Sequence, residues 1–432
     1  MKKVKWLMLL CLLLFPSANV FGETLNEYTK ESLTQLGYTP YNDVTSAMVV
    51  DVQTGDVYFA HNENRVVDPA SITKLMTAYL VYEAVANQSV SWDTKVTATA
   101  NDAAISRLPE LSNTTIIEGE TYTLQDLMYM HLMSSSNVAS VMMANLLSHN
   151  DLSAFVGQMN RTGQQLGLRH TTYTNPSGAV TADFSGLIQI SGYPANQPSY
   201  STAYDVAKLT VELLKKFPEI VNITQLTQVS VGKHTAYPET LTSTNVTLPG
   251  MPLGYAGVTG LKTGTSGESG YSFVASANRG DMQLVAVVLG VGRYGDGLGN
   301  MDRFYYTNAL LDKTYRTYSK KVVIAAGEYM VNDTEIRVES PYEAVVSQQG
   351  VSQNYRLEND ALVIQRPFQN LYGKTEDTIP VTNVTKLKQE EARRQQEQLL
   401  LGIVIVVLVV FVVGVLWRKL NGRQARNKRR YK

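Results

Sequence analysis

The sequence predicts an α+β fold, in which helices are segregated from an antiparallel sheet, followed by a small β-rich domain and a C-terminal transmembrane helix. Two apolar runs, 47–52 and 57–60, flank Thr54-Gly55 and indicate a hairpin near the start of the first domain. An apolar helical stretch follows from Ser71 to about Val85. Residues 261–277 and 283–291 then predict two neighbouring strands late in the same domain. Strands at both ends with helices between them are typical of an α+β architecture.

The first 22 residues have the layout of a secretory signal peptide. Lys2, Lys3 and Lys5 form a basic start, an apolar run of ten residues follows, and Gly22 is a small residue before polar Glu23. An uncleaved N-terminal anchor is the alternative. The only cysteine, Cys11, lies inside this segment, so we expect no disulfide and no thiolate metal site in residues 23–432.

The other end of the chain predicts a membrane span. Residues 399–417 are uncharged and mostly Val, Leu and Ile. As a helix they would extend ~28 Å at ~1.5 Å per residue, close to the ~30 Å hydrocarbon core. Residues 418–432 carry eight Lys or Arg and no acidic residue. The positive-inside rule therefore predicts a cytoplasmic tail and a single-pass protein of the cell membrane, with everything before 399 on the extracytoplasmic face.

Between these ends we expect a domain over 23–315, a β-rich accessory domain over 320–385 and a charged helical stalk over 386–398. The stalk is either solvated or lies on the membrane surface. The whole chain has 38 basic and 38 acidic residues. Removing the three lysines of the first segment and the eight basic residues of the tail leaves 27 against 38, a net charge of about −11. A nucleic-acid partner is therefore not expected.

Three short motifs carry the chemistry of the first domain. They are Ser71-Ile72-Thr73-Lys74, Ser135-Ser136-Asn137 and Lys262-Thr263-Gly264. Each is common by chance, and an exposed lysine after an N-cap serine explains most S-x-x-K matches. In this order, however, the three form the known pattern of a serine acyl-transfer site.

Ser71 and Lys74 are three residues apart, so a helix places them on one face. A serine hydroxyl needs a base before it can attack a carbonyl, but a lysine with pKa ~10.4 is a poor base at pH 7. We therefore expect burial or a second cation to lower the pKa of Lys74, and Lys262 is the candidate cation.

The other two motifs offer complementary groups. Ser135 can relay a proton to a leaving amine, and the Asn137 amide can hold a substrate amide. Lys262 supplies a positive charge, and the hydroxyls of Thr263 and Thr265 can bind a carboxylate. We expect Gly264 to leave room for a substrate backbone that lies alongside as an added strand.

Longer segments extend the likeness, among them DPASITKLMT around Ser71, TNPSGAV from Thr174 and GLKTGTSGESGYSFVASA from Gly260. With the three motifs, the chain resembles the serine-type D-alanyl-D-alanine carboxypeptidases, the low-molecular-weight penicillin-binding proteins. The resemblance implies a penicillin-binding/β-lactamase-like catalytic domain with Ser71 as the nucleophile, Lys74 as proton acceptor, and Ser135 with Asn137 as the second catalytic element. It also implies removal of D-alanine from peptidoglycan stem peptides, and acylation of Ser71 by β-lactams. Arg303 resembles a family arginine near the site. Thr265 stands where some members carry histidine.

Two other classes share the motifs. A class A β-lactamase uses a glutamate between the second and third motifs, yet no Glu occurs between Glu120 and Glu212. A non-catalytic β-lactam sensor or wall-binding protein on the same scaffold is the alternative that the sequence separates least.

Two further patterns predict no site. The glycines from Gly290 to Gly295 match a dinucleotide-binding pattern, but they open no obvious helix and predict a turn. The five histidines have no ligand spacing, so neither a metal nor another cofactor is expected.

Overall fold

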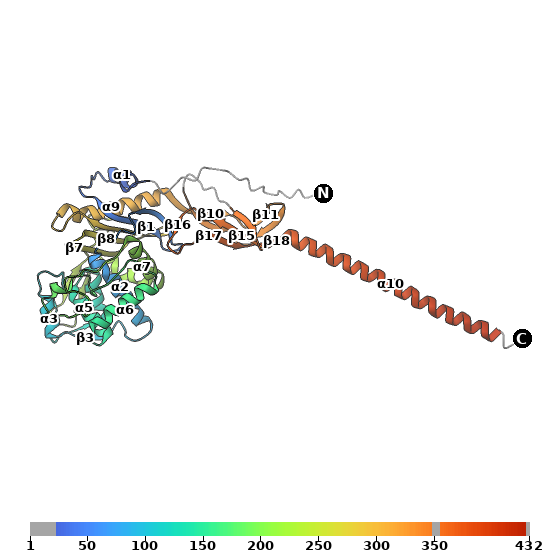
Figure 1. Cartoon of the computed structure of the whole chain (residues 1–432), viewed down its shortest axis with the longest axis horizontal. Helices are drawn as coiled ribbons and strands as arrows, with labels where there is room; N and C mark the ends of the chain where they lie inside the picture. Colours follow the sequence, from blue (N-terminus) through green and yellow to red (C-terminus); the bar gives the residue numbers. More distant parts are fainter. Residues whose placement is uncertain (1–22, 348–354, 429–432) are drawn as a thin grey trace.

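The computed structural model describes residues 23–347 and 355–428. The predicted signal peptide lies outside them. In this part of the chain a mixed sheet-and-helix body is followed by a β-rich region and a long helix that projects away from both (Figure 1). The α+β prediction is therefore confirmed.

A six-stranded antiparallel sheet forms the centre of the body, in the order β16-β2-β1-β9-β8-β7. The expected hairpin is β1 (Val44–Asp51) and β2 (Asp56–His61). Residues 261–277 are not one strand, however. They divide between β7 (Val258–Ser266) and β8 (Gly270–Arg279), which a short turn joins, and β9 (Met282–Val291) follows. β7 lies at an edge of this sheet.

Both faces of the sheet are covered, which explains its nearly continuous apolar strands. Along β9, Leu284, Ala286 and Val288 pack with α1 (Leu25–Gln35) and α9 (Gly297–Thr317). Val285, Val287 and Leu289 face the opposite core, which contains most of the helices. This alternation follows from the period of two along a strand.

The core on this opposite face is formed mainly by the helices that lie between the first and last strands of the body in the sequence. They include α2 (Lys74–Ala86), α4 (Leu124–Met133), α5 (Asn137–Ser148), α6 (Leu152–Gln165) and α7 (Ala203–Lys216). Smaller elements complete this part: α3 (Ala100–Ser106), α8 (Val221–Thr224), and the strand pairs β3 (Lys95–Thr97) with β4 (Thr121–Thr123) and β5 (Gln228–Val231) with β6 (Glu239–Thr242).

The turn from Gly290 to Gly295 leads directly into α9, so the expectation that no helix follows it was wrong. α9 continues to Thr317 and β10 (Tyr318–Ile324) begins at once. The β-rich region adds β11 (Gly327–Val331), β12 (Thr334–Val338), β13 (Tyr342–Ser347), β14 (Tyr355–Glu358), β15 (Ala361–Gln365), β17 (Glu376–Pro380) and β18 (Thr382–Asn383).

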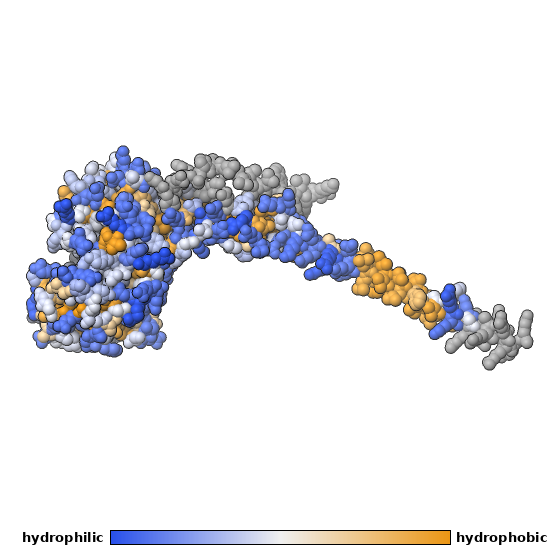
Figure 2. Space-filling model, in the orientation of Figure 1, coloured by the Kyte–Doolittle hydropathy of each residue, from blue (hydrophilic) through white to orange (hydrophobic). Residues whose placement is uncertain are grey.

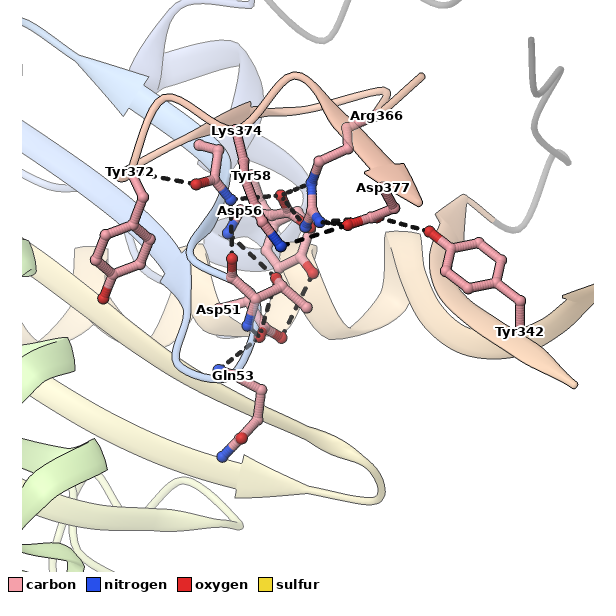
Figure 3. Close-up of polar contacts among 11 residues, drawn as sticks. Asp51, Gln53, Asp56, Tyr58, Tyr342, Arg366, Tyr372, Lys374 and Asp377 are labelled. Atoms are coloured by element: carbon pink, nitrogen blue, oxygen red, sulfur yellow. Dashed lines mark hydrogen bonds and ion pairs between the residues drawn. The ribbon is translucent and has the colours of Figure 1, made fainter. Parts of the chain in front are cut away.

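The β-rich region contacts the body through strand pairing as well as through the connecting chain. Its segment β16 (Gln369–Asn370) pairs with β2 and extends the central sheet. Figure 3 shows Arg366 beside this segment, between Asp56 of β2 and Asp377 of β17. The guanidinium lies 2.7 Å from the Asp56 carboxylate and 2.6 Å from that of Asp377, and the Arg366 side chain is 8% exposed. A buried ion-pair cluster therefore joins the two regions.

The predicted stalk and span form one helix, α10 (Val384–Lys428). Its apolar part is exposed along its length, with an apolar band between two hydrophilic segments (Figure 2). By length and composition this helix could cross a membrane. Its uniform exposure argues against the alternative of a core helix in a soluble protein.

Candidate active site

The first motif lies where a 3-10 turn, η1 (Ala70–Thr73), leads into α2. Ser71 is in the turn and Lys74 is the first residue of α2, so the α-helix begins three residues later than expected. The Asp68 carboxylate accepts a hydrogen bond from the Ala70 amide at 2.8 Å, which holds the start of the turn. Ala70 itself has a left-handed φ of 49°.

The Lys74 amine is fully buried and has three oxygen partners. Its Nζ lies 3.0 Å from Ser71 Oγ, 2.8 Å from Asn137 Oδ1 and 2.7 Å from the Ser177 carbonyl oxygen. The carbonyl can only accept, as can the Asn137 oxygen in this orientation. A neutral Lys74 amine that donates to both would therefore keep its lone pair for the Ser71 hydroxyl.

The electrostatics favour that neutral amine. Burial lowers the pKa of Lys74 well below its ordinary value, and the positive charge of Lys262 lowers it further. Both causes are those that the sequence analysis expected. No carboxylate forms an ion pair with Lys74 in the described part of the chain, so nothing there restores the ammonium form.

The three residues of the second motif have different positions and contacts. Ser136 is the N-cap of α5 and also contacts Thr114, at 3.0 Å between hydroxyl oxygens. Asn137 begins α5 and reaches Lys74. Ser135 has a left-handed φ of 59°, and its buried side chain lines the same cavity as Ser71.

The third motif lies on edge strand β7, opposite η1. Thr263 and Thr265 line the cavity, whereas Lys262 lies behind its wall and is 1% exposed. Burial, with the nearby charge of Arg303, lowers the pKa of Lys262 to about 7. The Lys262 amine donates to the Thr263 carbonyl oxygen at 2.9 Å.

The room that we expect beside Gly264 for a substrate strand stays a prediction, but this glycine also has a packing role. A Cβ at this position would lie 2.8 Å from the Pro69 carbonyl oxygen and 3.1 Å from Ile72 Cγ1. Gly264 therefore lets β7 pack closely against η1. This close packing brings the third motif to Ser71.

Arg303 of α9 also reaches this strand. It donates to the carbonyl oxygens of Gly264 at 2.8 Å and Ser272 at 3.2 Å, and it contacts Thr265 Oγ1 at 3.5 Å. Burial lowers the pKa of Arg303 to about 10. Arg303 therefore lies near the site, as the family resemblance implied.

The cavity between these elements has a volume of about 610 Å³. Ser71, Ser135, Asn137, Thr263, Thr265 and Arg303 line it, together with acidic Asp68, Glu110, Asp183 and Glu268. Its size suits a small peptide or drug-sized molecule. In the described ranges, no group of three or more His, Cys, Asp or Glu side chains could hold a metal ion.

Sequence reasoning missed two contributors. The Ser177 carbonyl oxygen contacts Lys74, and Gly178 follows it with a φ of 86°. A Cβ on Gly178 would lie 2.0 Å from the Ala70 carbonyl oxygen, so only glycine fits there. The other is Asp68, which also accepts a hydrogen bond from Ser266 of β7. The Asn175-Pro176-Ser177-Gly178 turn was the available signal for the first.

Comparison with known proteins agrees with this geometry. The chain is 31% identical over 249 residues to the D-alanyl-D-alanine carboxypeptidase DacF of Bacillus subtilis, and 30% identical over 256 residues to DacC of Escherichia coli. Each alignment covers 58% of this chain. It spans 58% of DacF and 57% of DacC, so the match is confined to part of each relative.

Solved structures are similar over a longer part of the chain. A peptidoglycan synthesis regulatory factor, PBP3 of Streptococcus pneumoniae, is 25% identical with a TM-score of 0.66, and the match covers 79% of this chain and 98% of that one. Penicillin-binding protein D2 of Listeria monocytogenes, in an ampicillin-bound form, is 29% identical with a TM-score of 0.52, covering 64% and 99%. A family model described as D-alanyl-D-alanine carboxypeptidase matches residues 37–292, more than half of the chain. The protein is therefore a member of the D-alanyl-D-alanine carboxypeptidase family, peptidase S11, among the low-molecular-weight penicillin-binding proteins.

Proposed function

We propose that the protein is a membrane-anchored serine DD-carboxypeptidase that removes the terminal D-alanine from peptidoglycan stem peptides. The observation that carries this proposal is the position of the Lys74 amine. Two acceptors hold its hydrogens, and its lone pair is free for the Ser71 hydroxyl, whose Oγ lies 3.0 Å away. Family membership and the relatives' names supply the substrate class.

In the proposed reaction Ser71 Oγ attacks the carbonyl carbon of the penultimate D-alanine and passes its proton to Lys74. The peptide bond breaks, the leaving amine takes a proton through Ser135, and free D-alanine departs. Water then hydrolyses the ester on Ser71. A β-lactam would acylate Ser71 in the same way, but its opened ring stays attached.

The wall of the cavity supports the binding role of the third motif. β7 is an edge strand, so an extended peptide can pair with it, and the Thr263 and Thr265 hydroxyls face the cavity where a terminal carboxylate would lie. The buried side chains of Lys262, when protonated, and Arg303 lie next to these threonines and would attract the carboxylate. The apolar part of α10 supports the membrane anchor, with the basic tail on the cytoplasmic side and the catalytic body outside.

The test uses the full-length protein in detergent. It should release D-alanine from a peptide ending in D-Ala-D-Ala and form a covalent adduct with a fluorescent penicillin, seen by gel and by intact mass. Ser71→Ala should do neither. Covalent labelling without D-alanine release would favour the β-lactam-sensing alternative, and rapid penicillin turnover would favour a β-lactamase. Equal activity of both variants would reject the proposal.

A further inference from the structure

His131 is a buried imidazole directly below the proposed catalytic pair, and no step of the proposed reaction uses it. It lies in the last turn of α4 and is 0% exposed. Its Nε2 is 2.9 Å from the backbone carbonyl oxygen of Lys74, and its Nδ1 is 2.9 Å from Ser140 Oγ. One side chain on α4 therefore contacts both α2 and α5.

These partners define where the protons are. The Lys74 carbonyl oxygen can only accept, so Nε2 carries a hydrogen. Burial lowers the pKa of His131 well below its ordinary value. The imidazole is thus neutral, and its Nδ1 is an acceptor. Ser140 Oγ has one hydrogen and lies 2.9 Å from two acceptors, Nδ1 and the Ser136 carbonyl oxygen, so it serves one of them at a time. The bond from Nε2 to the Lys74 carbonyl oxygen does not depend on that choice.

The two helices that His131 joins carry the two sides of the Lys74 site. Lys74 is the first residue of α2, and Asn137 is the first residue of α5, one turn before Ser140. The distance between the Lys74 amine and the Asn137 oxygen depends on how these two helix starts are held.

We propose that His131 is a positioning residue, which fixes the start of α2 against α5 so that the Lys74 lone pair stays directed at the Ser71 hydroxyl. This inference rests on the proposed function. Without the imidazole the first turn of α2 can shift, the Lys74 amine can become better hydrated, and its ammonium form is then favoured. The consequence should appear in the acylation step and in its pH dependence.

The test compares His131→Leu, which fills the volume without polar groups, with His131→Gln, whose amide can still donate to the Lys74 carbonyl. Acylation of the full-length protein by a fluorescent penicillin is measured from pH 5 to pH 9. We expect His131→Leu to lower the maximal acylation rate by about tenfold, the order of one lost buried hydrogen bond, with little change in the concentration for half-saturation. The acid limb of the profile should move to higher pH, and His131→Gln should restore most of the rate.

A role limited to stability predicts a different result. His131→Leu would then lower the melting temperature while the rate per folded molecule and the pH profile stay as in the wild type, which would overturn the inference. If His131→Leu does not fold, Ser140→Ala removes the Nδ1 contact with little change in volume, and an unchanged profile there would also overturn it. The proposed function fails separately, if the wild-type protein neither binds penicillin covalently nor releases D-alanine.

Discussion

Two buried groups of charges in this molecule are built in opposite ways. In the cluster around Arg366, the guanidinium contacts the carboxylates of Asp56 and Asp377, and the Lys374 amine lies 3.7 Å from Asp377, so two positive groups face two negative ones. In the site, Lys74, Lys262 and Arg303 are buried near one another, and in the described part of the chain none of them forms an ion pair. In the first arrangement burial lowers the pKa of Arg366 but the two carboxylates more than offset it, whereas in the second the pKa of both lysines is lowered.

The Arg366 cluster therefore serves stability, and the buried amines of the site serve the proposed reaction. Removing one partner from a balanced cluster costs stability, because it leaves a buried charge unpaired. Unbalanced amines make the folded state bind fewer protons than the unfolded chain, which costs stability, and they provide a base at neutral pH. Substitutions in the Arg366 cluster should therefore lower stability and spare acylation, whereas substitutions of the buried lysines should do the reverse.

The largest effect is expected for Lys74→Met. Loss of the proposed base should reduce acylation by penicillin by about 10²–10⁴-fold. Since the substitution also removes a buried amine that no carboxylate balances, the urea midpoint should not fall in proportion. Stopped-flow fluorescence and urea unfolding measure the two quantities. A large loss of stability together with near-normal acylation would contradict the comparison.

Arg366→Met should show the reverse pattern. It leaves Asp56 and Asp377 buried without their shared cation, so the free energy of unfolding should fall by about 3–5 kcal/mol. The active fraction should keep the wild-type acylation rate constant, because Arg366 does not line the cavity. Arg356→Met is the matched control, since its carboxylate partners are exposed and little change in the free energy of unfolding is expected.

Lys262→Met should change the pH profile. In the wild type, acylation should rise with pH as Lys74 loses its proton, and binding of a carboxylate substrate to the free protein should weaken above about pH 7 as Lys262 becomes neutral. Removing Lys262 removes the nearby positive charge, so the acid limb should move to higher pH. The exposed Lys321→Met should leave it in place. An unmoved limb in Lys262→Met would mean that the two amines do not interact.

The smallest effect concerns Asp68. Burial raises the pKa of Asp68 to about 6, above its ordinary value of 3.8. The folded state therefore binds more protons than the unfolded chain between these values, and this contribution to stability is lost as pH rises from about 4 to about 6. Asp68→Asn should remove that pH dependence, as urea unfolding at pH 4.5 and pH 7 can show. An unchanged pH dependence would mean that Asp68 titrates normally.

Contacts between residues close in the sequence were easier to predict than contacts between distant elements. Ser71 and Lys74 are neighbours on one turn, so their contact follows from local geometry. The order of the three motifs and their family resemblance also indicated that Asn137 and Lys262 belong near them. The contribution of Ser177 was missed because a backbone carbonyl has no residue type to recognise.

Longer-range relations were less predictable. The turn between β7 and β8 was missed although the segment 266–270, SGESG, has the serines and glycines typical of a turn. The packing of Gly264 against Pro69 and Ile72 could not be predicted, because these neighbours lie nearly two hundred positions away. Strand β16 has only two residues and no periodic pattern, so nothing local predicts its pairing with β2.

That pairing has a consequence for biosynthesis. Asn370 and Asp56 are 314 positions apart, so a ribosome must make nearly all of the chain before α10 ahead of the outermost strand of the sheet. Until then the β2 edge offers unpaired amide and carbonyl groups, which favour intermolecular strand pairing. A nascent chain would need a chaperone, or rapid elongation, to protect this edge.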